Sequence, residues 1–159
     1  MSLREQLLET FVHLPPMQIL DGLCGEDAVR IPMTGLHGVA AILGHMEFWQ
    51  AWFLRRCEGI GAPMPARADE GWPVVTPDQW PGLVARFGAA LERAVALGED
   101  QARLAQPIVP AIEFPPLAGY TIRSALTHMA QHNSHHLGQI VTARQILGLW
   151  PPPAGSLTW

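Results

Sequence analysis

Residues 121–140 read TIRSALTHMAQHNSHHLGQI and contain four of the seven histidines of the chain. Thr121 suits an N-cap, no proline interrupts the stretch, and a glycine and three prolines follow its end. We therefore expect a long helix over residues 121–147. Side chains three or four positions apart share one face of a helix, with Cβ atoms roughly 5–6 Å apart. His132 and His136 can therefore point at one common ion.

Two N-terminal segments also have helical periodicity. The first covers residues 3–14, and a short continuation over residues 17–23 is expected after two prolines. The second covers residues 34–58, with Thr34 as its N-cap and a glycine directly after its end. The apolar stripe of the first segment consists of Leu3, Leu7, Phe11 and Leu14.

The segment over residues 76–98 has the clearest helix start. Thr76 supplies an N-cap, Pro77 suits the first helical position, and Gln79 completes a capping box. Its expected buried face consists of Leu83, Phe87, Ala90, Leu91, Ala94 and Val95.

Two long connections, over residues 59–75 and 106–119, are rich in proline and separate the helices. Short strand pieces in the second are doubtful, because proline cannot donate to a sheet ladder. A chain of 159 residues suits one domain. We therefore expect an all-α fold, a four-helix bundle with long inter-helix crossings over residues 1–159, of which residues 150–159 form a proline-rich C-terminal tail.

The composition narrows the class of protein. A net charge of −4 and the lack of any run of basic residues argue against nucleic-acid binding. The N-terminus has no apolar signal segment, and polar residues interrupt the apolar stretch over residues 38–53, so we expect a cytoplasmic protein with no membrane partner. Charged residues make up only 15% of the chain, which fits a homodimer that hides part of its surface.

A third histidine can complete a metal site. His45 lies on an apolar stripe of the segment over residues 34–58, and it can join His132 and His136 if the two helices are neighbours. Three neutral imidazoles with open coordination positions are typical of a catalytic rather than a structural metal centre. Zinc and nickel both accept such ligands.

Other interpretations of these residues stay open. A histidine in a core is more often hydrogen-bonded than metal-bound. His128 is a rival ligand, because it also has helical spacing to His132, and His135 lies at the edge of the stripe. Gln139 is a candidate to support His136 by a hydrogen bond. We expect the two remaining histidines, His13 and His37, to lie at the surface or at helix ends.

Aromatic and acidic residues give weaker signals. Two of the six tryptophans, Trp49 and Trp52, either wall the site or belong to the core, and core is the favoured interpretation. Cys57 is expected to be a structural residue rather than a reactive thiol. The catalytic residues are unknown, because nothing places a general base, Glu47, Asp69 or Glu113, at the site.

The histidine motifs resemble those of a known family. The run HNSHHLGQI over residues 132–140 is similar to the signature of the DinB/YfiT-like metalloenzyme superfamily, typically His-x-x-His-His-Arg-Gly-Gln-Ile. The run LGHMEFW over residues 43–49 resembles the histidine motif of its second helix. The resemblance implies a four-helix bundle, often dimeric, with a divalent metal on His45, His132 and His136. This chain has Leu137 where an arginine is usual.

The resemblance also implies an activity, since characterised relatives include thiol-dependent S-transferases. We therefore expect a metal-dependent enzyme that activates a small-molecule thiol and adds it to an electrophilic substrate, with the loop over residues 59–75 as a lid. A metal-dependent hydrolase, in which the ion activates water, is an alternative. A non-catalytic metal-binding stress-response protein is another, and DNA binding is the least favoured.

Overall fold

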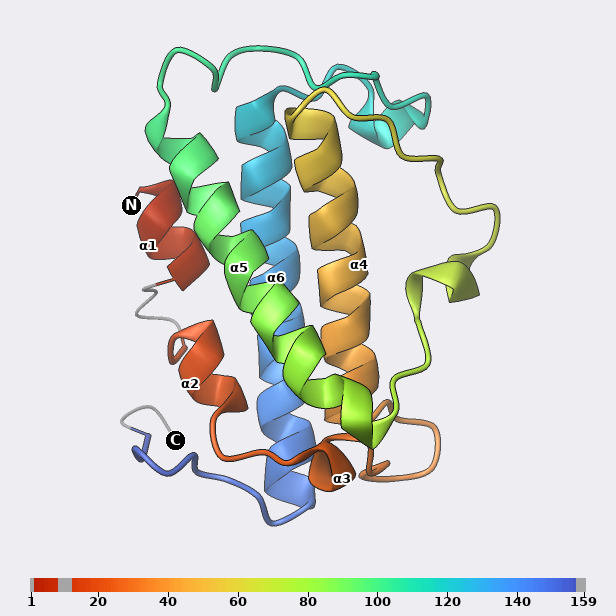
Figure 1. Cartoon of the computed structure of the whole chain (residues 1–159), viewed down its shortest axis with the longest axis vertical. Coiled ribbons are helices and arrows are strands. Elements are labelled where there is room, and N and C mark those ends of the chain that lie inside the picture. The colour runs from red at the N-terminus through yellow and green to blue at the C-terminus, as the bar shows by residue number, and fades with distance from the viewer. Residues whose placement is uncertain (1, 9–12, 157–159) are drawn as a thin grey trace.

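The computed structural model describes residues 2–8 and 13–156, and this part of the chain is all-α (Figure 1). No strand forms in it, and one isolated bridge joins Pro107 to Thr121. Both the expected fold class and the doubt about strands in residues 106–119 are confirmed. Its α-helices are α1 (Leu3–Leu8), α2 (Pro16–Leu20), α3 (Gly25–Ala28), α4 (Val39–Cys57), α5 (Trp80–Glu99) and α6 (Ile122–Ile146), with 3-10 turns η1 (Ala68–Gly71), η2 (Pro77–Gln79) and η3 (Pro115–Leu117).

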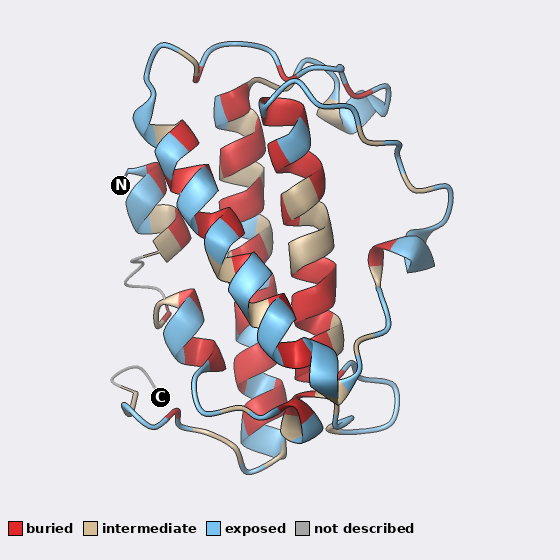
Figure 2. Cartoon of the chain, viewed as in Figure 1, coloured by how far each residue is buried: buried red, intermediate tan, exposed pale blue. Residues whose placement is uncertain are grey.

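Three long helices form the body of the bundle. Helix α4 packs against both α5 and α6, and α1 and α2 cover the remaining side, α1 against α5 and α6 and α2 against α6 (Figure 1). Buried residues run the length of α4 and α6 in Figure 2. No helix in the described residues combines the length and the apolar composition needed to cross a bilayer.

The third predicted helix and the fourth are confirmed with small shifts at their ends. Thr76 and Gln79 form the expected capping box at η2, which leads directly into α5. The whole predicted face of α5 is buried. At the start of α6, the Thr121 side chain accepts a hydrogen bond from the Ser124 backbone N–H, which satisfies one of the free donors of the first turn.

The first predicted helix is wrong in its extent. In the described residues α1 ends at Leu8, and His13 lies in a bend rather than in a helix. Phe11 lies outside the described residues. Pro15 adopts an extended conformation, φ −49° and ψ 140°, and proline also disfavours helical conformation in the residue before it. The chain therefore starts a separate helix, α2, at Pro16.

The second predicted helix starts four residues later than expected. Gly35 has a φ of +86°, which an α-helix does not accommodate, so Thr34 cannot be its N-cap. The N-cap is Gly38, where a Cβ atom would lie 2.6 Å from the Arg30 carbonyl oxygen. Only glycine fits this close approach of two backbone segments.

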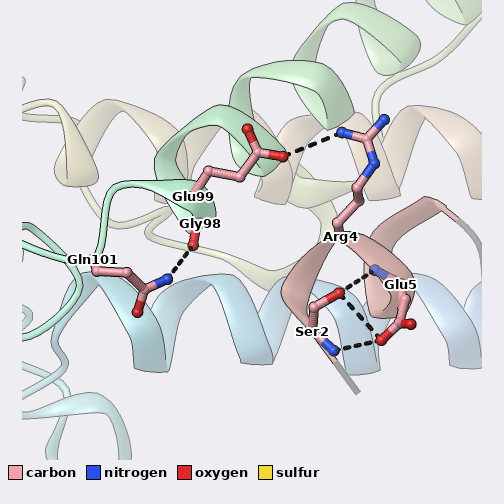
Figure 3. Close-up of polar contacts among 6 residues, drawn as sticks. All are labelled: Ser2, Arg4, Glu5, Gly98, Glu99 and Gln101. Carbon is pink, nitrogen blue, oxygen red and sulfur yellow. Dashed lines mark hydrogen bonds and ion pairs between the residues drawn. The ribbon is translucent and has the colours of Figure 1, made fainter.

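The short helix α1 packs against the end of α5, and Figure 3 shows the polar contacts around this junction. Arg4 forms an ion pair with Glu99 at 3.3 Å, and the Ser2 hydroxyl accepts a hydrogen bond from the Glu5 backbone N–H at 3.2 Å. A Cβ atom at Gly98 would lie 3.2 Å from the Leu3 Cβ, so the two helices approach closely there. Exposed ion pairs contribute about 0–1 kcal/mol, so apolar packing dominates this contact.

Two polar arrangements fix the bundle and its crossings. Inside, the Asn133 side chain donates to Gln50 Oε1 at 2.8 Å, and the Gln50 amide donates to the Phe87 carbonyl at 3.1 Å, which links α6, α4 and α5. At the end of α4, the buried Arg56 guanidinium donates to the Pro110 and Ala62 carbonyls, at 2.6 Å each. Arg56 thereby ties both long crossings to one helix.

Candidate metal centre

The three predicted ligands lie together between α4 and α6. One ligand atom from each of His45, His132 and His136 lies within 4.8 Å of the other two. The Nε2 atoms of His45 and His132 are 3.2 Å apart. Two nitrogens that each lie about 2.0–2.1 Å from one tetrahedral ion are about 3.3–3.4 Å apart. This pair therefore has a spacing close to that of two metal ligands.

Hydrogen bonds turn the Nε2 atom of two of these histidines toward the group. His45 Nδ1 lies 2.7 Å from the Gly71 carbonyl oxygen, and His136 Nδ1 lies 2.7 Å from Gln139 Oε1. An oxygen acceptor requires the proton on Nδ1, and a neutral imidazole carries only one. The Nε2 atoms of His45 and His136 therefore carry lone pairs, and His45 Nε2 accepts a hydrogen bond from His132 Nε2 at 3.2 Å, which an ion would replace. The contact expected between Gln139 and His136 is confirmed.

Burial keeps the three imidazoles neutral. His45 is 9% exposed and His136 is 7% exposed, and desolvation is the main cause that lowers the pKa of each. Desolvation, followed by the charges of neighbouring histidines, lowers the pKa of His132 to about 3. All three side chains are therefore in the neutral form that binds metal at physiological pH.

An aromatic ring from the long crossing covers the group. Trp72 follows η1 and stacks on His45, with ring centroids 3.9 Å apart. Its ring also stacks on the exposed His37, at 4.0 Å. Trp49 meets His45 edge-on at 6.5 Å, so it borders the site. Trp52 is buried in the core, which confirms the core interpretation for that residue.

Sequence reasoning missed the contribution of this crossing. Residues 59–75 were expected to act as a lid, and in the structure they supply a carbonyl, from Gly71, and a ring, from Trp72, to one histidine. Neither has a sequence signature, although a tryptophan in a proline-rich loop is a hint of a packing role. The expected surface position of His13 is also wrong, because His13 is 7% exposed and its Nδ1 lies 2.7 Å from the Leu14 carbonyl.

The rival ligand His128 lies outside the group. Its ring centroid is 6.4 Å from that of His132, and its Nδ1 lies 3.1 Å from the Tyr120 hydroxyl. Its ring also packs against Phe53, with centroids 4.9 Å apart. The exposed His135 interacts with Gln139 at 3.3 Å and does not join the three histidines.

The remaining candidates take structural or surface positions. Burial raises the pKa of the Cys57 thiol to about 11, so it is protonated and unreactive at neutral pH. Glu47 lies 3.7 Å from Arg86, and Asp69 pairs with Arg67. No carboxylate belongs to the histidine group of the described residues, and no general base is assigned.

Leu137 stands where the family signature usually has an arginine. Its side chain is fully buried, at 1% exposure. It belongs to the apolar core together with Ile140 and Leu126. An arginine at this position would bring a charge into the core without an evident partner. The leucine therefore fits its surroundings, and this chain has no cation at that position.

One of three comparisons with known proteins gave a match. Residues 17–140 match the protein-family model described as the DinB superfamily. The matched range extends from α2 into α6 and contains His45, His132 and His136. Comparisons with curated proteins and with solved structures gave no match.

Proposed function

Because the chain belongs to the DinB superfamily, we propose that it binds a divalent metal ion through His45, His132 and His136 and uses it to transfer a low-molecular-weight thiol to an electrophile. The observation that carries this proposal is the 3.2 Å separation of the His45 and His132 Nε2 atoms. The two histidines lie on different helices and are 87 positions apart in the chain. This separation is close to that of two nitrogen ligands of one tetrahedral ion, and it supports the proposal.

The donor set favours an open site. The group consists of three imidazoles with no carboxylate or thiolate, so a tetrahedral ion would keep one position for an exogenous ligand. When bound, such an ion supplies the positive charge that lowers the pKa of a thiol and favours the thiolate. Imidazole ligands suit zinc and nickel equally, so either metal is compatible with the site.

The protein prepares this site in two ways. Gly71 and Gln139 fix the rings of His45 and His136, so that the lone pairs converge before an ion arrives. Trp72 covers one face of His45 and excludes water from it. In the transfer itself, the thiol releases its proton to solvent water, its sulfur forms a bond to an electrophilic carbon, and the leaving group departs with the electron pair of the broken bond.

Metal-assisted hydrolysis is the second candidate, and the same open donor set supports it. Such a reaction would use water in place of the thiol. The two functions differ in the co-substrate that accelerates turnover. They can therefore be separated with one preparation of metal-loaded protein.

The test compares His132→Ala with His128→Ala, since both histidines lie on α6 but only His132 belongs to the group. Metal content is measured on protein purified without added ions and after saturation with Zn²⁺ or Ni²⁺. Thiol transfer is followed with 1-chloro-2,4-dinitrobenzene, and hydrolysis with 4-nitrophenyl acetate. We expect His132→Ala to lose stoichiometric metal and thiol transfer, and His128→Ala to keep its metal.

Two results would overturn the proposal. Stoichiometric metal in His132→Ala would show that this histidine is not a ligand. Ester hydrolysis by the metal-loaded wild type without any thiol transfer would favour the hydrolase instead.

A further inference from the structure

A cavity of about 500 Å³ is lined by Gln139 and His135, which both contact His136. The segment that precedes α4 forms one wall, with Leu36 and His37, and Ile42 of α4 contributes to it. The C-terminal half of α6 forms the other wall, with Gly138 and Gln139. Cavities of about 300–1,000 Å³ are the usual size of small-molecule sites.

One side chain separates the cavity from His136, and two stacked rings separate it from His45. Gln139 lines it and accepts the hydrogen bond from His136. His37 also lines it and stacks on Trp72, which stacks in turn on His45. A molecule held here would therefore lie beside the histidine group.

The walls of the cavity carry no carboxylate and no guanidinium. Their polar groups are two imidazoles, an amide and a hydroxyl, and the hydroxyl of Thr142 already donates to the Gly138 carbonyl at 3.0 Å. A charged ligand would lose hydration there without gaining an ion pair. An uncharged ligand would bury its apolar part against Leu36 and Ile42.

We propose that this cavity binds an uncharged, largely apolar small molecule through the side chains of Leu36, Ile42 and Gln139. On the function proposed above, on which this role rests, that molecule is the electrophile, with its reacting carbon directed toward the metal ligands. The binding preference itself is a property of the cavity walls and can be measured without catalysis.

The first experiment uses two probes of similar shape, 4-nitrobenzyl alcohol and 4-nitrobenzoate, in equilibrium dialysis. Gly138→Phe fills the cavity, because a Cβ atom at Gly138 meets nothing within 4 Å and the position lines the cavity. The matched control is Gly82→Phe, at an exposed position of α5 away from the cavity.

We expect the alcohol to bind the wild type and Gly82→Phe equally, and to bind Gly138→Phe about tenfold more weakly or worse, a difference of about 1.4 kcal/mol. The benzoate should bind the wild type at least about tenfold more weakly than the alcohol, because the walls carry no lysine or arginine to offset the loss of hydration of its carboxylate. Equal affinity of the alcohol for Gly138→Phe and the wild type would overturn the proposal, and so would a preference for the benzoate.

A second measurement separates this inference from the proposed function. With Co²⁺ bound, the proton resonances of the alcohol should broaden in the wild type, and they should not broaden in Gly138→Phe. Binding to the cavity by a protein that takes up no metal would contradict the proposed function and leave the cavity site intact. Metal binding without any binding of the alcohol would refute the cavity site alone.

Discussion

Replacing Gln139 with leucine is expected to weaken metal binding without unfolding the protein. In the structure, Gln139 Oε1 lies 2.7 Å from His136 Nδ1 and fixes both the ring orientation and the proton position of that histidine. Leucine has a similar size but accepts no hydrogen bond. The His136 ring would then sample orientations and a tautomer in which Nε2 no longer faces the other two histidines.

The magnitude follows from the role of the contact. Loss of a partner that orients a metal-binding histidine typically lowers metal affinity by about 10–100-fold, which corresponds to about 1.4–2.7 kcal/mol. Gln139 is exposed, and a surface substitution changes the free energy of unfolding by about 0.5 kcal/mol or less. The loss of affinity should therefore exceed any loss of stability of the metal-free protein.

The assay is competition for Zn²⁺ with a chromophoric chelator, together with urea denaturation of the metal-free proteins. Gln145→Leu is the matched control, because Gln145 is an exposed glutamine on the same helix. Gln139→Glu should equal or exceed the wild type in affinity, since a carboxylate accepts the same proton in a stronger hydrogen bond. If Gln139→Leu and Gln145→Leu bound Zn²⁺ equally well, the argument that Gln139 orients His136 would be refuted.

Three further perturbations test the site and its support. Trp72→Leu removes the ring stacked on His45 at 3.9 Å, and we expect several-fold faster transfer of bound metal to a chelator; an unchanged rate would argue against a covering role. Asn133→Leu leaves the buried Gln50 Oε1 without its donor and should lower the free energy of unfolding by about 1–3 kcal/mol. The double variant Gln50→Leu/Asn133→Leu should recover much of this loss. If urea denaturation gave the same loss for the single and the double variant, the result would count against the amide contact. The pKa of His132 is about 3 in the folded chain, against an ordinary value of 6.5. Between these two pH values the unfolded chain binds a proton at this histidine that the folded chain does not bind. The free energy of unfolding of the metal-free protein should therefore fall by up to about 1.4 kcal/mol per pH unit for this histidine as the pH drops below 6.5. His132→Asn should show a shallower dependence on pH. Identical slopes in the wild type and the variant would contradict the lowered pKa.

The fold and the candidate ligands could be predicted because they depend on periodicity. The spacing of His132 and His136 places both on one side of α6 whatever surrounds them. His45 could be added because its helix has an apolar stripe. The capping box at Thr76 is likewise a local signal and is present in the structure.

The parts that were missed depend on tertiary contacts or on backbone conformation. No pattern indicates that the Gly71 carbonyl would meet His45 from 26 positions away. The positive φ of Gly35 is a property of the turn rather than of the residue type, so the start of α4 was placed too early. Asn133 lies between two histidines on the sequence but points to Gln50 instead, and a single sequence gives no means of pairing these amides.

The chain of amides from Asn133 through Gln50 to the Phe87 carbonyl also sets the alignment of the helices along their axes. Apolar side chains tolerate sliding, whereas these directional bonds are satisfied at one position only. A slip of α4 along α6 by a single turn, about 5.4 Å, would break both amide bonds and carry the His45 ring out of reach of His132. The side chains of Gln50 and Asn133 are neutral and buried, at 1% and 4% exposure. Their hydrogen bonds therefore hold α4 and α6 in the one alignment that keeps the imidazoles of the two helices within reach of each other.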